Sequence, residues 1–232
     1  YVDKKYNKNF TNNKFTTPYL GPSYSNDQIR SAINEKISQP NNEIEIKYHK
    51  DFKKLTNEIA KFILDGKVVG WFQGRMEWGP RALGNRSILA NPAIKNMKDI
   101  INAKIKKRED FRPFAPSILE THYKEYFESK ENLEFMGYVV NVVDKKIAEK
   151  IPSVVHSDGT ARVQLVKKNI NPKFHQLIES FNELSGIPLL LNTSLNVDEP
   201  ICESPLQAIS SFTASSMDIL VMENFVLIKK KI

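Results

Sequence analysis

The chain has 232 residues and 41% of them are hydrophobic, which is enough for one large buried core. No run of 18 apolar residues occurs, so the sequence excludes a membrane-spanning helix, and a single cysteine, Cys202, excludes an internal disulfide. We therefore expect a protein of the reducing cytoplasm. The formal net charge of +7 is compatible with nucleic acid, a membrane surface or an anionic small molecule as a ligand.

The first part of the chain predicts an arm followed by alternating helices and strands. Residues 1–18 are rich in Lys, Asn and Thr and predict an irregular segment, and Ser25 is a suitable N-cap for the first helix. Apolar residues at helical spacing and a polar–apolar alternation mark the elements that follow. In chain order the predicted elements are a helix over 26–38, a strand over 43–48, a helix over 51–65 and a strand over 67–73.

The stretch from Gly70 to Pro92 (GWFQGRMEWGPRALGNRSILANP) holds four of the nine glycines and three of the seven arginines. The glycines interrupt any amphipathic pattern, so we predict a shaped loop here in place of a regular element. Lysine is the common cation of this chain, and arginine therefore indicates positions where a planar fork of donors is needed. Arg75, Arg81 and Arg86 predict a ligand with several anionic oxygens, such as a phosphate chain, although any one of them could instead hold a loop to an internal carboxylate.

Helices and strands continue to alternate through the rest of the chain. Pro113 and Pro116 exclude a helix over 106–119, so we expect Arg112 and Ser117 on a rigid extended segment. This alternation predicts an α/β fold with a mixed, largely buried sheet. The remaining predicted elements are helices over 94–107, 121–129, 171–185 and 204–215, and strands over 137–143, after a turn at 157–159, over 187–191 and over 218–228.

Two polar segments are candidates for ligand contact. One follows the predicted strand 187–191, at the C-terminal end where ligands of open α/β sheets bind, and its hydroxyl and amide groups suit a phosphate, a ribose or a carbonyl. The other follows the turn at 157–159. The alternative for both segments is ordinary turn chemistry. The candidate residues are Thr160, Arg162, Asn192, Thr193, Ser194 and Asn196.

His156 stands alone near the second of these segments, so it is either a general base, a metal ligand or a polar residue of the turn. No cluster of His, Asp and Glu has metal-ligand spacing, and we predict no metal bound by protein groups alone. A Walker A loop, a Rossmann fingerprint and a Ser-His-Asp set are also missing from the sequence. A phosphate site in this chain therefore has to use arginine forks and hydroxyl groups.

Two long motifs are specific enough to identify relatives. Gly-Pro-Arg-Ala-Leu-Gly-Asn-Arg-Ser spans residues 79–87, and Phe-Arg-Pro-Phe-Ala-Pro-Ser spans residues 111–117. Together with shorter segments between Tyr19 and Pro200, these motifs resemble the C-terminal domain of the O-carbamoyltransferase family, which includes nodulation and antibiotic-tailoring enzymes. The resemblance covers most of the chain.

This resemblance implies both a fold and a reaction. In the family, the C-terminal domain resembles the YrdC/Sua5 fold, an α/β module with a twisted mixed sheet and flanking helices. The domain uses ATP with Mg²⁺ and carbamoyl phosphate to form carbamoyl-adenylate, and a separate Kae1-like N-terminal domain with a bound metal transfers the carbamoyl group to a hydroxyl. That domain has no counterpart in this sequence. We therefore expect residues 1–45 to be a linker toward it, in cis or in trans, and residues 46–232 to be the adenylate-forming domain.

The resemblance also assigns roles to residues. The Lys-x-Arg pair of the YrdC/Sua5 fold matches Lys106 and Arg108, which we predict to hold the adenylate phosphate and the carbamoyl oxygen, with Arg112 as a third catalytic cation. The Ser-x-Asn pair matches Ser194 and Asn196. The predicted substrate and nucleotide contacts are Arg75, Arg81, Arg86, Ser87, Ser117, Thr160, Arg162, Asn192, Thr193, Ser194 and Asn196.

Two other functions are alternatives at this point. A basic YrdC-like module could bind RNA, although we expect small-molecule substrates and not nucleic acid as the partners. The chain could also resemble an enzyme that makes threonylcarbamoyl-adenylate for tRNA modification. The motif over residues 79–87 favours the simple carbamoyl family over this enzyme.

Overall fold

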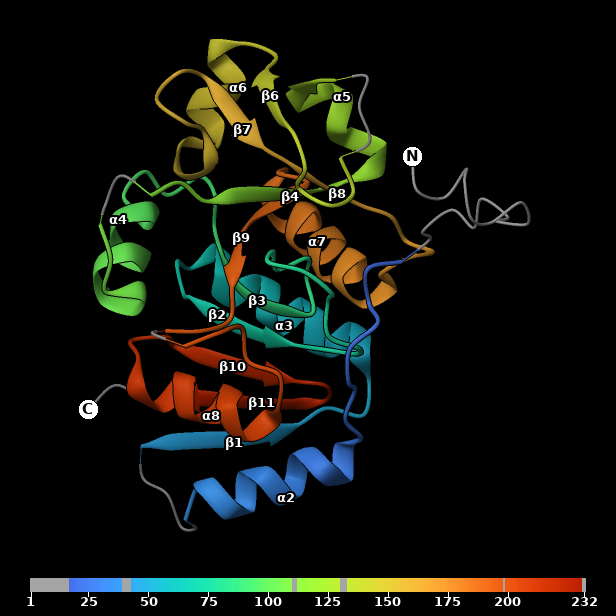
Figure 1. The fold of residues 1–232 in the computed structure, drawn as a ribbon, viewed down its shortest axis with the longest axis vertical. Helices are drawn as coiled ribbons and strands as arrows, with labels where there is room; N and C mark the ends of the chain where they lie inside the picture. Colours follow the sequence, from blue (N-terminus) through green and yellow to red (C-terminus); the bar gives the residue numbers. More distant parts are fainter. Residues whose placement is uncertain (1–16, 39–42, 110–111, 130–132, 198, 231–232) are drawn as a thin grey trace, which may run out of the picture.

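An eight-stranded mixed sheet forms the centre of the molecule in the computed structural model, with the strands in the order β1-β11-β10-β2-β3-β9-β4-β8, from bottom to top in Figure 1. β10 pairs with β2 and β4 pairs with β8 in parallel, whereas the other neighbours are antiparallel. The strands are β1 (Ile44–Tyr48), β2 (Val69–Phe72), β3 (Arg86–Ala90), β4 (Ala115–Leu119), β8 (Gln164–Val166), β9 (Leu189–Ser194), β10 (Ile219–Met222) and β11 (Phe225–Lys229). The structure describes residues 17–38, 43–109, 112–129, 133–197 and 199–230.

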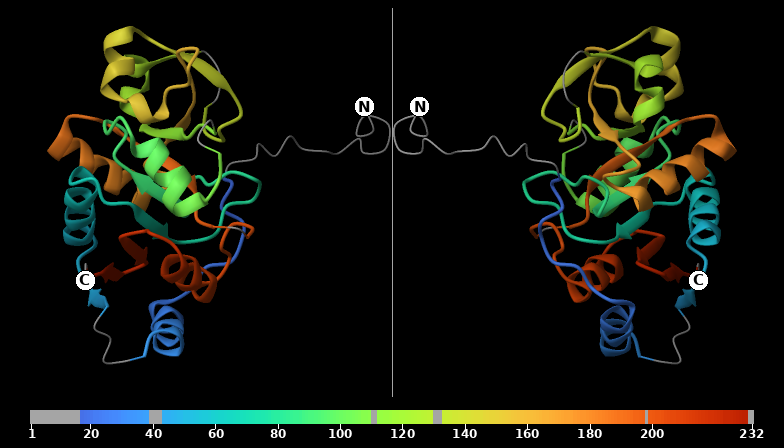
Figure 2. Two further views of the ribbon diagram at one scale, coloured as in Figure 1. Left: turned by 90° about the vertical axis from the view of Figure 1, so that its left-hand side faces the viewer. Right: turned by 90° about the vertical axis from the view of Figure 1, so that its right-hand side faces the viewer.

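Helices cover both faces of this sheet, as the two side views in Figure 2 show. Side chains of alternate residues in a strand point to opposite faces, so each strand serves two cores. In β2, Val69 and Trp71 pack with α3 (Phe52–Leu64) and α7 (Pro172–Ser185), whereas Phe72 belongs to the core on the other face. That second face is covered by α2 (Asn26–Lys36), α4 (Met97–Ile101) and α8 (Pro205–Ala214).

A smaller three-stranded sheet lies at one end of the molecule, beyond β4 and β8 (Figure 1). The chain passes directly from β7 to β8, with Val163 between them, and this connection joins the small sheet to the large one. The elements of this end are a 3₁₀ turn at Glu120–His122, α5 (Tyr123–Tyr126), β5 (Phe127–Glu128), β6 (Val139–Val142), α6 (Lys145–Lys150), a 3₁₀ turn at Pro152–Val154 and β7 (Thr160–Arg162).

The segment before β1 packs against the sheet domain. Ile29 and Ile33 of α2 are buried in the same core as α8. Before α2, the Tyr19 hydroxyl donates to the Leu83 carbonyl at 2.8 Å, and the Gly21 N–H donates to the Met76 carbonyl at 2.9 Å. Residues 17–38, which the sequence analysis placed in a connecting arm, are therefore built into the fold. Residues 1–16 of that predicted arm lie outside the described residues.

Most predicted helices are present, and Ser25 is the N-cap that the sequence predicted. Ser25 caps α2 in a capping box with Gln28, Asn171 accepts from the N–H of Phe174 at the start of α7, and Gly186 follows α7 with φ of 70°. Hydroxyl and amide caps satisfy the free N–H groups of the first turn, which is why these residue types mark the boundaries. Together with the buried mixed sheet, these helices confirm the predicted α/β fold class.

The central stretch differs from the predicted loop. Only residues 73–85 form a loop, and residues 86–90 form β3, which is buried along its whole length between β2 and β9. The glycines that suggested a loop end at Gly84, and the apolar run after Arg86 then fills the middle of the sheet. Glycine content was therefore a poor guide to the last third of this stretch.

Three other boundaries differ from the predictions. The helix predicted over 121–129 ends at Tyr126, because Phe127 and Glu128 pair with β6. The helix predicted over 94–107 changes from α4 into a π-helix, Asn102–Lys106. In place of the single strand predicted over 218–228, the structure has a hairpin of β10 and β11. Glu223 lies in its turn with φ of 48°.

Candidate active site

Two adjoining cavities lie beside the C-terminal end of β9. The small cavity has a volume of about 150 Å³ and is lined by Pro80, Arg81, Ala82, Arg108, Pro113, Phe114, Ala115, Met136, His156, Arg162, Asn192, Thr193 and Ser194. The large cavity has a volume of about 380 Å³ and is lined by Lys106, Lys107, Arg108, Glu109, Arg112, Ser194, Asn196, Val197 and Glu199. Arg108 and Ser194 line both cavities, so the two adjoin at these residues.

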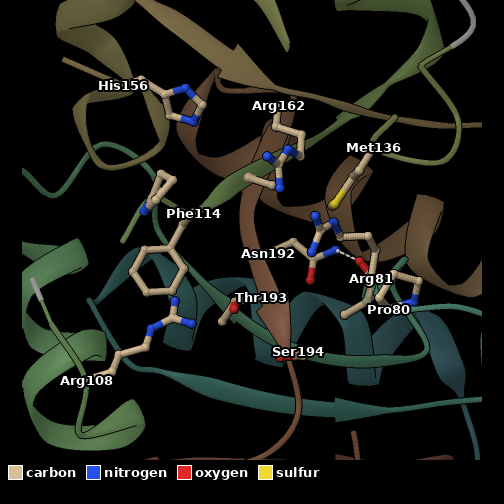
Figure 3. A pocket seen from close by; sticks show the side chains of 13 residues that line it. Pro80, Arg81, Arg108, Phe114, Met136, His156, Arg162, Asn192, Thr193 and Ser194 are labelled. Atoms are coloured by element: carbon tan, nitrogen blue, oxygen red, sulfur yellow. Dashed lines mark hydrogen bonds between the residues drawn. The ribbon is translucent and has the colours of Figure 1, made fainter. Parts of the chain in front are cut away.

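Three guanidinium groups reach the small cavity from three separate parts of the fold (Figure 3). Arg81 comes from the loop 73–85, Arg108 follows the π-helix, and Arg162 ends β7. None of the described residues that line the small cavity is an Asp or a Glu. Planar cations without a competing carboxylate make this cavity a site for a small anion with several oxygens.

Glu77 shapes the loop that carries Arg81. Its side chain is 4% exposed, and its Oε1 accepts hydrogen bonds from the backbone N–H groups of Leu83 at 2.7 Å, Asn85 at 2.7 Å and Arg86 at 3.1 Å. A buried carboxylate that accepts several N–H bonds holds a loop rigidly. The sequence analysis missed this residue, although Glu77 is the single acidic residue between Gly70 and Pro92 and that isolation was a usable signal.

The π-helix sets the direction of Lys106 and Arg108. It ends at Lys107, which adopts a left-handed conformation with φ of 47°, and the Lys107 and Arg108 N–H groups both donate to the Asn102 carbonyl. The Asn102 Oδ1 also accepts from Arg108 Nε at 2.8 Å, which holds the guanidinium near the Phe114 ring. Short π-helical turns often occur at functional sites, and Lys106 and Arg108 lie at the end of this one.

Lys106 is enclosed by oxygens of the β9 terminus. Its side chain is 5% exposed, and Nζ donates to the Ser194 carbonyl at 2.6 Å, the Asn196 carbonyl at 2.9 Å and the Asn196 Oδ1 at 2.6 Å. Burial lowers the pKa of Lys106 to about 7, and the positive charge of Arg108 adds to this effect. Burial likewise lowers the pKa of Arg108, with Arg112 contributing in the same direction. The predicted Lys-x-Arg and Ser-x-Asn pairs are thus brought together in one place.

A buried polar network supports the small cavity from below. The Ser117 hydroxyl donates to Gln164 Oε1 at 2.6 Å, and Asn192 Nδ2 donates to Ser117 Oγ at 2.9 Å. Ser117 and Gln164 line neither cavity. Both accept hydrogen bonds from the Asn192 amide and hold it in place. Asn192, Thr193 and Ser194 do line the small cavity, as the position at the end of the strand predicts.

Two of the predicted arginine ligands are used by the protein itself. Arg86 is fully buried, stacks on Phe72 with its guanidinium carbon 3.6 Å from the ring centre, and donates to backbone carbonyls that include Gln73 at 2.8 Å and Pro22 at 3.2 Å. Burial lowers the pKa of Arg86 to about 10. Arg75 donates to the Leu20 carbonyl at 2.6 Å and the Gly21 carbonyl at 3.0 Å. Neither lines a cavity, and both fix the segment before α2.

The remaining predicted residues divide between the two cavities and the scaffold. Arg112 lines the large cavity and pairs with Glu109 at 2.9 Å, and Asn196 lines the same cavity. Ser87 is buried in β3, where its hydroxyl accepts from the Gly84 N–H at 3.0 Å. Ser87 lies outside both cavities, because its side chain faces the loop and not the space above the sheet.

His156 lines the small cavity and is held by a chain of two hydrogen bonds. Its Nδ1 lies 3.0 Å from the Thr160 hydroxyl, which donates to Asp158 Oδ1 at 2.7 Å. Because that hydroxyl proton goes to the carboxylate, His156 carries its own proton on Nδ1 and leaves Nε2 as an acceptor. Burial lowers the pKa of His156, so the ring is neutral at neutral pH. Thr160 therefore reaches the site through His156, and it does not line the cavity itself.

Over the described residues, no group of three or more His, Cys, Asp and Glu side chains could hold a metal ion. No helix within the described part of the chain is long and apolar enough to cross a membrane.

Residues 60–229 match the family described as Carbamoyltransferase C-terminus, and the chain belongs to this family. It is 44% identical over 217 residues to nodulation protein NolNO of Sinorhizobium fredii, covering 92% of the chain and 31% of the relative. It is 41% identical over 216 residues to nodulation protein NolO of Bradyrhizobium diazoefficiens, covering 91% of the chain and 38% of the relative. The chain thus spans about a third of the length of these curated relatives.

Among solved structures, the fold is similar to that of full-length HypF in its phosphate- and nucleotide-bound form. The TM-score is 0.52 at 19% identity, over 77% of this chain and 22% of the HypF chain. Sua5 of P. abyssi in complex with L-threonine aligns with a TM-score of 0.48 at 17% identity, over 70% of this chain and 45% of that chain. The likeness to HypF shows the α/β fold that the resemblance implied, and the family assignment made from the motifs is confirmed.

Proposed function

We propose that the chain is the activating domain of a carbamoyltransferase, which binds ATP and carbamoyl phosphate and forms carbamoyl-adenylate. The observation that carries this proposal is the small cavity, where Arg81, Arg108 and Arg162 meet without a carboxylate in the lining. At about 150 Å³ it is smaller than the usual pocket for a drug-sized ligand, and it suits a compact acyl phosphate.

The large cavity takes the nucleotide phosphates in this proposal. Lys106, Arg108 and Arg112 supply positive charge there, and Ser194 and Asn196 supply polar groups at the strand end. In this proposal water cleaves carbamoyl phosphate to carbamate and inorganic phosphate, and a carbamate oxygen then attacks the α-phosphate of ATP as pyrophosphate leaves. Since Arg108 lines both cavities, it contacts both reactants at this second step. In phosphoryl transfer the protein mainly positions the reactants and stabilises charge on the phosphoryl oxygens, which is what these cations do.

Mg²⁺ bound to ATP would neutralise part of the phosphate charge in this cavity. Magnesium in nucleotide sites is held by one or two carboxylates together with phosphate oxygens. Glu199 lines the large cavity and fits this role, because its carboxylate already accepts from the Ser211 hydroxyl at 2.8 Å and is held in place. Glu109 is paired with Arg112 and is less suited.

The carbamoyl group is passed on by a Kae1-like N-terminal domain, in cis or in trans, which transfers it to a hydroxyl acceptor. Relatives about three times as long as the matched segment support a partner domain of this kind. The buried free thiol of Cys202 fits a reducing cytoplasm, where ATP is available.

The test is pyrophosphate release from ATP and Mg²⁺ by the purified chain. We expect release with carbamoyl phosphate, and little with bicarbonate and threonine. Release driven by bicarbonate and threonine would replace the proposal with threonylcarbamoyl-adenylate synthesis. Tight RNA binding with a steep salt dependence and no ATP binding would replace it with a nucleic-acid module.

A further inference from the structure

Asn192 offers the small cavity a hydrogen-bond acceptor that nothing in the protein uses. Its side chain is 1% exposed, and its Oδ1 has no hydrogen-bond partner. Three other side-chain oxygens in the described part of the chain share this state, on Asn26, Gln73 and Glu77, but none of those residues lines the small cavity. A buried acceptor without a partner costs free energy, so its presence in a cavity indicates a ligand that supplies a donor.

The orientation of the Asn192 amide is fixed by its neighbours. Nδ2 donates to Ser117 Oγ at 2.9 Å, to Gln164 Oε1 at 3.2 Å and to the Ala82 carbonyl at 3.2 Å. Gln164 is itself fixed, because its Nε2 donates to the Leu83 carbonyl at 2.7 Å. A flipped Asn192 amide would place its oxygen against these acceptors, so the nitrogen faces the protein and the oxygen faces the ligand.

Figure 3 shows this oxygen pointing into the space between the side chains of Thr193 and Arg81. A carbonyl oxygen repels a phosphate oxygen, so Asn192 Oδ1 needs a ligand group that donates a hydrogen bond. The guanidinium groups of Arg81, Arg108 and Arg162 already serve anionic oxygens in the same cavity. The cavity therefore combines donors for oxyanions with one buried acceptor for an N–H group.

We propose that the Asn192 amide oxygen accepts a hydrogen bond from the amino group of the carbamoyl substrate and thereby selects it over acyl phosphates that lack this group. This inference rests on the proposed function. Carbamoyl phosphate carries both features within one small molecule, an NH₂ group at one end and phosphate oxygens at the other. Acetyl phosphate has a methyl group of similar size in place of the NH₂, and it leaves Oδ1 buried without a partner.

The experiment compares the affinities of carbamoyl phosphate and acetyl phosphate for the purified chain by calorimetric titration. We expect the wild-type chain to bind carbamoyl phosphate about tenfold more tightly, the size of one net hydrogen bond. In Asn192→Ala this preference should fall to about onefold, mainly through weaker binding of carbamoyl phosphate. Asn91→Ala is the matched control, because it makes the same change at a buried asparagine that lies outside both cavities, and the preference should persist.

The outcomes separate the inference from the function beneath it. If the wild-type chain binds both ligands equally well, Asn192 does not select the amino group, while the proposed function still stands. This outcome is measured on the wild-type chain alone and does not depend on the folding of a variant. A preference unchanged in a folded Asn192→Ala chain overturns the role of Asn192 as well. If neither acyl phosphate binds the wild-type chain, the proposed function fails and the inference fails with it.

Discussion

At the scale of single residues, the arginines of this chain show how one side chain serves two purposes. The five N–H donors of a guanidinium match phosphate oxygens, but they match backbone carbonyls equally well. Arg81, Arg108 and Arg162 line the small cavity. Arg86 instead donates its hydrogen bonds to backbone carbonyls of the protein. The sequence shows the residue type and the local glycines, and it does not show burial, which decides between the two uses.

Arg108→Ala should abolish pyrophosphate release while the fold remains intact. Arg108 lines both cavities and is held in place by Asn102, so it contacts the charge that develops between the two reactants. Loss of such a contact costs on the order of 3 kcal/mol in the transition state, or at least 10²-fold in rate. Steady-state rates and circular dichroism of the purified variant measure both effects.

Two other arginines provide the contrast for this variant. Arg30 lies outside both cavities and stacks near Tyr48 and Phe225, so Arg30→Ala should keep the rate within a few fold. Arg86→Ala should mainly lower the unfolding temperature, because it removes a buried cation that binds several carbonyls. A rate for Arg108→Ala equal to that for Arg30→Ala would remove Arg108 from the site.

The low pKa of Lys106 predicts the shape of the pH profile. Because burial lowers this pKa to about 7, the fraction of charged Lys106 in the free protein falls as the pH rises above that value. Binding of an anion needs the charged form, so kcat/KM should decline on the alkaline side of about pH 7. At saturating substrate the decline should move to higher pH, because bound phosphate favours the ammonium ion.

Lys106→Met should be slower at every pH and should lose this alkaline decline. The pKa of His156 is lowered by burial, so its titration belongs to the acid side of the profile and does not mimic that of Lys106. A profile for Lys106→Met that keeps the same alkaline limb would assign the limb to another group.

At the scale of elements, the predicted helices and their caps were largely right because their signals are local. A Ser before an apolar run or a Gly after it marks a boundary without help from the rest of the fold. The π-helix at Asn102–Lys106 and strand β3 could not be predicted in this way. β3 is a strand because β2 and β9, which are distant in the sequence, lie on either side of it. The π-helix is closed by local bonds from the Lys107 and Arg108 N–H groups to the Asn102 carbonyl, which the spacing of apolar residues does not reveal.

Gly84→Ala tests how tightly the loop 73–85 is packed on α7. A Cβ at Gly84 would lie 2.1 Å from the Phe174 ring, and the residue has φ of 98°. Both a steric overlap in the core and an unfavourable backbone conformation oppose alanine here, so we expect a loss of several kcal/mol or about 10 °C or more in unfolding temperature. Thermal unfolding followed by circular dichroism measures the loss.

The matched control is Gly159→Ala. Gly159 also has a positive φ, 80°, but a Cβ there would meet nothing within 4 Å. We expect this variant to lose only the conformational term, about 1 kcal/mol. Equal losses at the two positions would show that the Phe174 contact is not what requires glycine at position 84.

At the scale of the whole molecule, the described chain supplies cations and hydroxyls but no equipment for activating an alcohol. Transfer to a hydroxyl needs a metal or a positioned base, and the described residues hold no cluster of metal-ligating side chains. His156 lines the small cavity with its Nδ1 on Thr160, and no second base or metal ligand accompanies it among the described residues that line this cavity. The motifs in the sequence predicted the family and the fold correctly.

The chain on its own should therefore carbamoylate no hydroxyl acceptor. Incubation with ATP, Mg²⁺, carbamoyl phosphate and a panel of sugars and aminoglycosides, followed by mass spectrometry, tests this expectation. Addition of a Kae1-like partner domain in trans is the positive control. A carbamoylated sugar formed without that domain, and after removal of contaminating full-length enzyme, would place the transfer site within these 232 residues.

The most direct test of the central claim is detection of carbamoyl-adenylate itself. The purified chain is mixed with ATP, Mg²⁺ and ¹³C-labelled carbamoyl phosphate, quenched rapidly, and analysed by mass spectrometry with Arg108→Ala as the inactive reference. We predict a labelled carbamoyl-adenylate that appears together with pyrophosphate and only when both substrates are present. Pyrophosphate release without the labelled adenylate, or no reaction in a folded chain that binds both substrates, would contradict the account.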